Sequence, residues 1–341
     1  MPRRYLLSID GGGIRGIIPA VALAKLEATT GRPAREIFSF VAGTSTGAII
    51  AAAIAARIPA TRIVELYVER APEVFTGPTL LNTLRRIFTG SMYSTRKLHD
   101  VISEELGPEA RDWSLNHSPI DLLLTAKGVP DGKPWYFVKD NPNNSGCTGT
   151  LGLADCVTGS AAAPTYFEPW TIEEPPDRPP DCKRVGAVVD GGVGAAGNPV
   201  YQACVEAFYY ADGYRPGETT TVSMGTGRSI VPKRRPTWIW SWLQWILGEL
   251  LESPGEQQTE IAWRHFVEDQ PEDQKMTFYR IDTELKEDIA LDDVGKIDRL
   301  RKYGEQLAEL IDWEKILDGT DKTFEVDYKH RLFPQYAKKT V

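Results

Sequence analysis

Two consecutive segments repeat the order strand, glycine turn, helix, and this repetition limits the folds open to the chain. The apolar run at 5–9 breaks at three glycines, and helical spacing of apolar residues follows at 17–29. A second apolar run at 37–42 leads through a tight turn into an alanine-rich helix at 48–57. Strands that alternate with helices pair in parallel, because each crossover helix returns the chain to the same end of the sheet. The N-terminal part therefore predicts a parallel sheet covered by helices.

The rest of the chain extends this pattern up to about residue 230 and then departs from it. Periodicity predicts strands at 120–126, 135–139, 185–189 and 220–224, and helices at 62–70, 95–105, 153–162 and 199–210. We expect an α/β domain at 1–230, a three-layer α/β/α sandwich with a mostly parallel central sheet. Beyond it, one strand at 276–281 and a polar helix at 296–311 predict a mainly helical C-terminal extension at 231–341, packed on or capping the first domain.

Charge argues against one class of partner. Lys and Arg number 39 and Asp and Glu number 47, which gives a net charge of −8, and the basic residues are scattered. Nucleic-acid-binding proteins instead gather positive charge on one surface, because phosphate contacts dominate their affinity. We expect no nucleic acid polymer as a partner.

The cysteines and apolar runs predict a location. Cys147, Cys156, Cys182 and Cys204 form no CxxC pair, and a chain of 341 residues needs no covalent cross-link to build a core. We interpret all four as reduced thiols. The run at 5–9 is too short for a signal-peptide core, and no aliphatic run approaches the roughly 20 residues that span a bilayer. We therefore expect a cytoplasmic protein that meets the inner membrane face only peripherally.

A serine stands in a turn that suits a nucleophile. Gly43, Thr44, Ser45, Thr46 and Gly47 have the G-x-S-x-G form, with a predicted strand before them and a predicted helix after. Flanking glycines allow the sharp turn that lifts a serine hydroxyl out of the backbone, and the N-terminal end of the helix favours the negative charge of an attacked ester. Small residues that let a helix pack against a sheet give the same pattern. We take Ser45 as the candidate nucleophile.

A second loop, at Asp10, is rich in glycine. Gly11, Gly12, Gly13, Ile14, Arg15 and Gly16 can point several backbone amides at one oxygen, as an oxyanion requires. Their spacing also satisfies the dinucleotide-binding G-x-G-x-x-G pattern, which needs an acidic residue at the end of the second strand. The second predicted strand ends at Gly43 without one. Arg15 either holds this loop, meets an anionic group, or pairs with a carboxylate on the surface.

The general base is the next requirement of a serine nucleophile. The histidines are His99, His117, His265 and His330, and none lies in a convincing setting. Asp190, followed by Gly191 and Gly192, comes directly after the predicted strand at 185–189. This order places its carboxylate at the carboxyl edge of the sheet, where the sites of α/β folds form. We take Asp190 as the base, with a histidine-dependent hydrolase using His265 or His330 as the alternative.

Taken together, these motifs resemble the patatin-like phospholipase family. The chain carries its D-G-G-G-x-R-G loop at 10–16, its G-x-S-x-G turn at 43–47 and its D-G-G motif at 190–192, in family order. The resemblance extends to S-A-A-A-P-T-Y-F at 160–167, N-P at 198–199 and S-M-G-T-G at 223–227, and covers about 5–228. We expect a bacterial member of that family.

The resemblance implies a Ser–Asp dyad without histidine, with Ser45 as nucleophile, Asp190 as base and the amides of residues 11–16 as the oxyanion hole. It implies a calcium-independent lipid acyl hydrolase of phospholipase A or lysophospholipase type, acting on membrane phospholipid or lysophospholipid, without a metal or organic cofactor. Some bacterial proteins of this family are effectors of phage defence that a cyclic nucleotide activates, so a small-molecule activator is a subordinate hypothesis. A nucleotide-binding regulator that uses the loop at 11–16 is the alternative from another class.

Four tryptophans form a cluster after the basic residues at 233–235. Trp238, Trp240, Trp242 and Trp245 fall within eight residues, and on a helix they would make a wide apolar surface beside three cations. That combination is typical of a membrane interface. It also fits a buried helix or a contact between the subunits of a homo-oligomer, and the segment also reads as a strand. Membrane contact is our functional hypothesis for these tryptophans.

Overall fold

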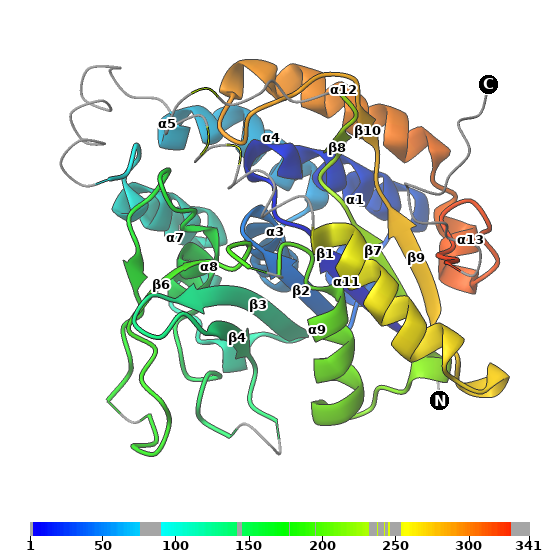
Figure 1. The fold of residues 1–341 in the computed structure, drawn as a ribbon, viewed down its shortest axis with the longest axis horizontal. Coiled ribbons are helices and arrows are strands. Elements are labelled where there is room, and N and C mark those ends of the chain that lie inside the picture. Colours follow the sequence, from blue (N-terminus) through cyan, green and yellow to red (C-terminus); the bar gives the residue numbers. More distant parts are fainter. Residues whose placement is uncertain are drawn as a thin grey trace.

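The computed structural model describes residues 3–75, 90–141, 145–176, 178–194, 196–231 and 254–328, together with Thr237, Trp242 and Trp245. Its centre is an eight-stranded sheet in the order β5-β6-β3-β2-β1-β7-β9, with β4 paired to β3 (Figure 1). Five strands run parallel: β3 (Asp121–Gly128), β2 (Phe40–Thr44), β1 (Arg4–Ile9), β7 (Thr219–Met224) and β9 (Thr277–Ile281). Strands β4 (Pro134–Val138) and β6 (Ala187–Asp190) are antiparallel to β3, and β5 (Trp170–Thr171) is antiparallel to β6.

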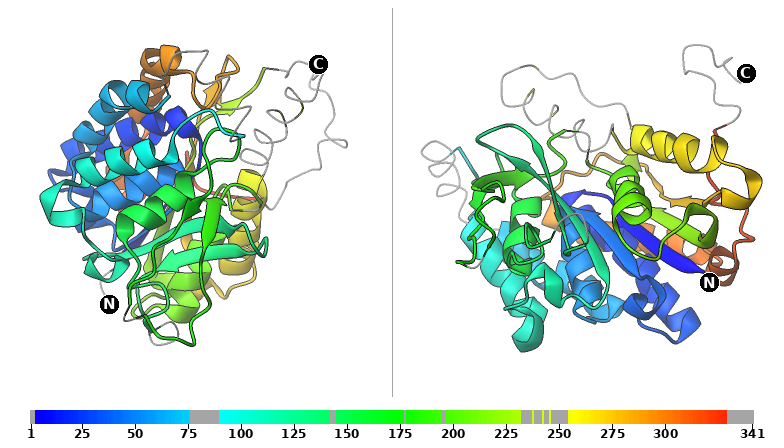
Figure 2. Two further views of the ribbon diagram at one scale, coloured as in Figure 1. Left: turned by 90° about the vertical axis from the view of Figure 1, so that its left-hand side faces the viewer. Right: turned by 90° about the horizontal axis from the view of Figure 1, so that it is seen from below.

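Helices cover both faces of this sheet, because its strands are apolar on both sides. Leu7 and Val41 face one core cluster, and the residues beside them, Leu6 and Phe40, face another. The first face is covered by α1 (Ile17–Thr30), α3 (Thr46–Ala55), α8 (Leu153–Ala161) and α12 (Ile297–Leu310), and the second by α9 (Val200–Val205) and α11 (Pro254–Trp263). Figure 2 shows the sheet between these two layers. The predicted mostly parallel α/β fold is confirmed.

Shorter elements complete the first layer and the connections. They are η1 (Gly13–Gly16), α2 (Ala34–Ile37), α4 (Ala60–Glu69), α5 (Ala71–Phe75), α7 (Thr95–Ala110), η2 (Leu115–His117), η3 (Glu206–Tyr210), η4 (Pro216–Glu218), η5 (Arg264–Glu268), η6 (Glu272–Gln274), η7 (Val294–Lys296) and α13 (Trp313–Asp318). A small parallel pair joins β8 (Arg228–Ser229) to β10 (Glu284–Leu285). No helix in the described residues is long and apolar enough to cross a membrane.

Residues beyond 230 contribute to the central sheet itself. Strand β9 pairs with β7 from Thr220↔Thr277 to Met224↔Ile281, and α12 packs on α1. A Cβ atom at Gly304 in α12 would lie 3.2 Å from the Cα of Ile18, so the two helices meet closely there. The described C-terminal part thus provides an edge strand and part of both helical layers, α12 on one face and α11 on the other. The boundary at 230 stays a prediction, although the sheet runs across it.

The expectation of four reduced thiols is wrong for two of them. Cys147 and Cys182 form a disulfide, whereas Cys156 and Cys204 are free and buried. The two loops that carry the bonded pair lie against each other, because Nε of Arg178 donates to the carbonyl of Cys147 at 2.9 Å. The separation of 35 positions between the two cysteines conceals this proximity in the sequence.

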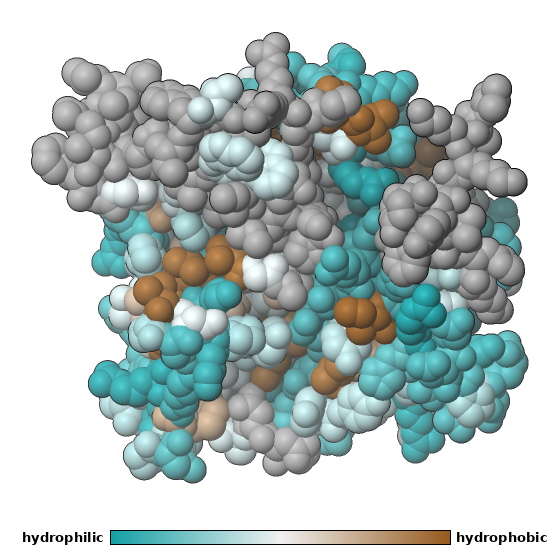
Figure 3. Space-filling view, in the orientation of Figure 1, coloured by the Kyte–Doolittle hydropathy of each residue, from teal (hydrophilic) through white to brown (hydrophobic). Residues whose placement is uncertain are grey.

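The tryptophan cluster is described only in part. Trp238 and Trp240 lie outside the described residues, whereas Trp242 and Trp245 are 45% and 38% exposed, with ring centroids 5.8 Å apart. On the face drawn in Figure 3, hydrophobic residues form small separate areas among hydrophilic ones. Membrane contact by this cluster stays a prediction.

Candidate active site

Ser45 lies in a tight turn between the end of β2 and the start of α3. Its backbone has φ 56° and ψ −121°, a strained conformation for a residue with a side chain, and 6% of its surface is exposed. A Cβ atom at Gly43 would lie 2.2 Å from the carbonyl oxygen of Gly47, and one at Gly47 equally close to that of Ile9. The chain can make this turn only because both flanking residues are glycine.

Asp190 reaches the same place from the opposite direction. Strand β6 is antiparallel to β3, and its last residue, Asp190, pairs with Ala126, one position beyond the pair Thr44↔Thr125. One edge of β3 pairs with β4 at Ala126 and Lys127. The partner of these residues on the opposite edge is β6, and that edge also pairs with β2 up to Thr125. The end of β6 therefore meets the end of β2. Asp190 therefore lies at the carboxyl edge of β2 and β3, as its position after an apolar run suggested, although the strand that carries it is antiparallel to them. An antiparallel strand that runs toward the end of β2 brings it beside Ser45.

The Asp190 carboxyl is fully buried, and one of its two oxygens accepts a hydrogen bond from the backbone. The amide of Gly192 donates to Oδ1 at 2.8 Å, whereas Oδ2 is buried without another hydrogen-bond partner in the described residues. Burial raises the pKa of Asp190 to about 6, an effect that the nearby Ser45 hydroxyl and the Gly192 amide partly oppose. A Cβ atom at Gly191 would lie 2.1 Å from Oγ1 of Thr125, so glycine is required there too. One carboxylate oxygen is thus available to the serine.

The glycine loop faces the serine, and most of its amides are already used. A Cβ atom at Gly11 would lie 3.3 Å from that of Ser45. The amides of Gly11, Ile14 and Arg15 donate to the carbonyls of Gly197, Leu291 and Gly12 at 2.9, 2.9 and 3.1 Å. Those of Gly12 and Gly13 have no acceptor in the described part of the chain. These two are the candidate oxyanion donors of the six residues that the sequence suggested.

One of the three interpretations of Arg15 placed its side chain on the surface. The structure contradicts that interpretation, because Arg15 is buried. Only 2% of it is exposed, and it follows Gly13 and Ile14 in η1. It lines a polar cavity of about 250 Å³ on the Asp10 side of the glycine loop.

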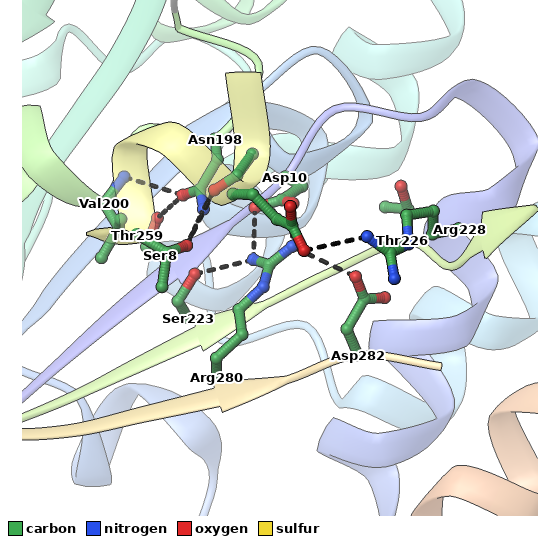
Figure 4. Close-up of polar contacts among 12 residues, drawn as sticks. Ser8, Asp10, Asn198, Val200, Ser223, Thr226, Arg228, Thr259, Arg280 and Asp282 are labelled. Carbon is green, nitrogen blue, oxygen red and sulfur yellow. Dashed lines mark hydrogen bonds and ion pairs between the residues drawn. The ribbon is translucent and has the colours of Figure 1, made fainter. Parts of the chain in front are cut away.

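A partly buried ion pair that the sequence analysis missed holds the start of this loop. The two guanidinium nitrogens of Arg280, on β9, donate to the two carboxylate oxygens of Asp10 at 3.0 and 2.6 Å (Figure 4). Arg280 also donates to Oγ of Ser223 at 2.8 Å and pairs with Asp282 at 3.2 Å. Burial raises the pKa of Asp10 to about 6, and the charge of Arg280 opposes that rise. No local pattern links residue 280 to residue 10.

An apolar cavity opens at the serine. Its volume is about 130 Å³, and Ser45, Thr46, Gly13 and Ile14 form part of its wall. The remaining lining is mainly aliphatic and aromatic, and comes largely from α3, α4, α5 and α7 and the segment at 161–167. Its charged members, Arg70 and Glu105, pair with each other at 3.0 Å. The site therefore presents a hydroxyl to a space that suits a hydrocarbon chain.

Histidines are engaged elsewhere in the described structure. His99 stacks on Trp170, His117 contacts Ser114, and His265 lies between Tyr201 and Tyr209. None of the three lines the apolar cavity, and His330 lies outside the described residues. The described part of the chain also holds no group of three or more His, Cys, Asp or Glu side chains that is arranged to bind a metal ion.

Comparison with known proteins gives consistent matches. The family model described as patatin-like phospholipase matches residues 7–204. Patatin-like protein 2 of Arabidopsis thaliana is 30% identical over 275 residues, which are 71% of this chain and 65% of that protein. A cGAMP-activated phospholipase of Escherichia coli (strain TW11681) is 30% identical over 217 residues, 61% of this chain and 56% of that one.

The chain thus spans between about half and two thirds of these relatives. Two solved structures also align with it. VipD from Legionella pneumophila has a TM-score of 0.43 and 12% identity, over 94% of this chain and 67% of that one. The type III effector protein ExoU has a TM-score of 0.40 and 11% identity, over 93% and 54%. By the family match over more than half of its length, this chain is a member of the patatin-like phospholipase family.

Proposed function

We propose that this protein hydrolyses the fatty acyl esters of glycerophospholipids, as a phospholipase A or lysophospholipase, through an acyl-enzyme on Ser45 with Asp190 as the base. One observation carries the proposal: a buried carboxylate with an available oxygen lies beside a strained serine at an apolar cavity. Family membership supports a lipid acyl hydrolase. The roles of Ser45 and Asp190, which the resemblance to that family implies, are part of our proposal.

In the first half of the reaction, Oγ of Ser45 attacks the ester carbonyl carbon as Asp190 accepts the hydroxyl proton. The carbonyl oxygen gains the negative charge and accepts hydrogen bonds from the amides of Gly12 and Gly13. When this tetrahedral intermediate collapses, the alcohol oxygen leaves and takes the proton from Asp190. The fatty acyl group remains esterified to Ser45.

In the second half, water takes the place of the departed alcohol. Asp190 accepts a proton from the water as its oxygen attacks the acyl carbon, and the same two amides again bind the oxyanion. Collapse releases the fatty acid, and the proton passes from Asp190 to Oγ of Ser45. The protein ends the cycle as it began, with atoms and charges balanced.

The raised pKa of Asp190 suits this role. A carboxylate with a pKa of about 6 is ionised at neutral pH, yet it is more basic than an exposed aspartate. Neither step calls for calcium, because backbone amides bind the oxyanion. Peripheral contact with a membrane would supply the substrate, and the exposed Trp242 and Trp245 are candidates for that contact.

Incubation of the purified protein with mixed phospholipids and lysophospholipids, followed by mass spectrometry of the products, tests the proposal. We expect free fatty acid from the parent protein, with or without a calcium chelator, and none above background from S45A. Fatty acid release by S45A at the parent rate would refute the assignment. Binding of NAD by the parent without hydrolysis would favour the nucleotide-binding alternative.

Activation by a cyclic nucleotide is a second proposal, which rests on similarity to a cGAMP-activated phospholipase. The polar cavity that Arg15 and Asp10 line lies behind the glycine loop, so a ligand bound there would touch the candidate oxyanion segment. The lipid assay repeated with and without cyclic dinucleotides tests it. Stimulation by at least tenfold supports the proposal, and full activity that no cyclic nucleotide alters contradicts it.

A further inference from the structure

One short segment contacts the backbone of both proposed catalytic residues. At the end of α8, Oγ of Ser160 accepts a hydrogen bond from the amide of Ser45 at 3.0 Å. Two residues further on, the carbonyl of Ala162 accepts one from the amide of Asp190, also at 3.0 Å. Ser45 and Asp190 are 145 positions apart in the sequence, yet the backbone amides of both donate to the segment 160–162.

The amide of Ser45 needs such a partner. It precedes the first turn of α3, so the helix offers it no acceptor, and it is buried together with its residue. A buried amide without a partner is rare in folded proteins because water cannot replace the lost bond. The strained φ of Ser45 makes the demand stronger, since its surroundings must hold that conformation in place.

Helix α8 is itself fixed against the strand that carries Asp190. A Cβ atom at Gly159 would lie 2.6 Å from Cγ2 of Val188 on β6, so the two elements are in close contact there. Ser160 is fully buried, which leaves its hydroxyl no solvent to bond. The segment at 160–162 therefore has little freedom to move relative to β6.

We propose that Ser160 is a positioning residue for the Ser45 and Asp190 pair. Its hydroxyl fixes the backbone of the nucleophile, and the main chain two residues later fixes that of the base. A single rigid segment thus sets the placement of Oγ of Ser45 relative to Oδ2 of Asp190. This inference rests on the proposed function and adds a residue that does not itself touch the substrate.

The test is S160A, with T158V as the matched control. Oγ1 of Thr158 is buried on the same helix and donates only to the carbonyl of Ala154, at 2.7 Å, so T158V also removes one buried hydroxyl. We expect S160A to lower kcat about tenfold to a hundredfold, as misplacement of a reacting group by a fraction of an ångström to 1 Å does. KM and the midpoint of the pH profile should stay within error. T158V should keep the parent kcat.

Reaction with a fluorophosphonate gives a second readout, because it reports the reactivity of Ser45 without lipid binding. The rate constant for S160A should fall by the same factor as kcat, and S160T, which keeps the hydroxyl, should recover most of it. A kcat for S160A within twofold of the parent overturns the inference. So does an equal loss in S160A and T158V, or in S160A and S160T.

The experiment distinguishes misfolding of S160A, failure of the proposed function, and failure of the inference about Ser160. If S160A does not fold, S160C takes its place with the same expectations, since a thiol is a weaker acceptor than a hydroxyl. If S45A keeps the parent activity, the proposed function fails whatever S160A does. If S45A is inactive and S160A resembles the parent, only the inference about Ser160 fails.

Discussion

The nucleophile turn and the glycine loop lie side by side but are held by different kinds of interaction. Uncharged groups hold the turn: the hydroxyl of Ser160 bonds to Ser45, and the carbonyl of Ala162 to Asp190. A partly buried ion pair between Asp10 and Arg280 holds the start of the loop. The carbonyl of Leu291 and the hydroxyl of Thr226 add two more bonds, at 2.9 and 2.8 Å.

This difference follows the order of the chain. Every residue that holds the nucleophile turn falls within 7–204, the part that the family model matches. Gly197, which accepts from the amide of Gly11, also lies within this part, whereas Thr226, Arg280 and Leu291, which hold the loop as well, lie beyond it. The turn is therefore self-contained in the N-terminal part, whereas the loop with the candidate oxyanion donors depends in addition on residues beyond 204. The two regions should respond to substitution in different ways.

The largest effect should come from the nucleophile turn itself. S45A and D190N are each expected to lower kcat about 10⁴-fold or more, because the members of such a unit act together. Release of fatty acid from phospholipid measures the loss, and thermal unfolding confirms that both variants are folded. A residual kcat above about a tenth of the parent value in either variant would contradict the catalytic role of the substituted residue.

A substitution in the loop should cost less than the loss of the nucleophile. G13A places a Cβ atom 2.3 Å from the carbonyl of Leu291 at a residue with φ 56°, so the candidate oxyanion amide must shift. We expect kcat to fall about 10²-fold to 10³-fold, as on removal of one oxyanion donor. G31A is the control, because Gly31 also has a positive φ, of 64°, but open space around it. Equal kcat in the two variants would show that the loop does not bind the oxyanion.

The ion pair should affect stability more than turnover. R280Q leaves the Asp10 carboxyl without its ion-pair partner. Because this pair is only partly buried, we expect the loss of unfolding free energy to lie between the roughly 1 kcal/mol of an exposed pair and the roughly 3–5 kcal/mol of a buried one. We expect kcat to fall about tenfold, since the loop loses one of several anchors. R228Q removes an exposed pair with Glu256 and should cost at most about 1 kcal/mol. Denaturant unfolding and kcat measurements on both variants test this, and equal losses would contradict it.

The smallest expected effect concerns pH. Because burial raises the pKa of Asp190 to about 6, kcat/KM should rise tenfold per pH unit below that value and level off above it. The same shift lowers stability as pH rises, since the folded state holds its proton more tightly than the unfolded state does. At pH 7.5 the free energy of unfolding of D190N should therefore be about 1–3 kcal/mol larger than that of the parent. This difference should shrink to well under about 1 kcal/mol near pH 4 and vanish below about pH 3.

S45A serves as the control for that stability difference, because it keeps the Asp190 carboxyl. It should show no gain at pH 7.5. A D190N variant that is less stable than the parent at both pH values would show that the buried carboxylate stabilises the fold, against our account.

Local patterns were sufficient for much of the fold and for the position of the motifs. The apolar runs at 5–9 and 37–42 became β1 and β2, and the glycines at 43 and 47 allow the turn that their spacing predicted. These features depend on residues a few positions apart, which periodicity and turn chemistry can detect. The sequence predicted that Ser45 and Asp190 lie at the same edge of the sheet, but it held no signal that β6 is antiparallel to β3.

The features that sequence reasoning missed all join distant residues. Strand β9 pairs with β7 across 57 positions, Arg280 bonds to Asp10 across 270, and Cys147 bonds to Cys182 across 35. A single sequence holds no periodic signal for such pairs, because their proximity arises only from the way that the sheet is assembled. Ser160 lay within a motif that was noted, but its bond to Ser45 appears only in three dimensions.

The central claim is that the Asp190 carboxylate activates Ser45 without an imidazole. Mass spectrometry of the protein after reaction with a fluorophosphonate, in the parent, D190N, and a variant with all four histidines replaced, tests it most directly. We predict that the parent and the histidine-free variant are modified at Ser45 at similar rates and that D190N reacts at least about 10³-fold more slowly. Modification of another serine, parent-like labelling of D190N, or loss of labelling in a folded histidine-free variant would contradict the account.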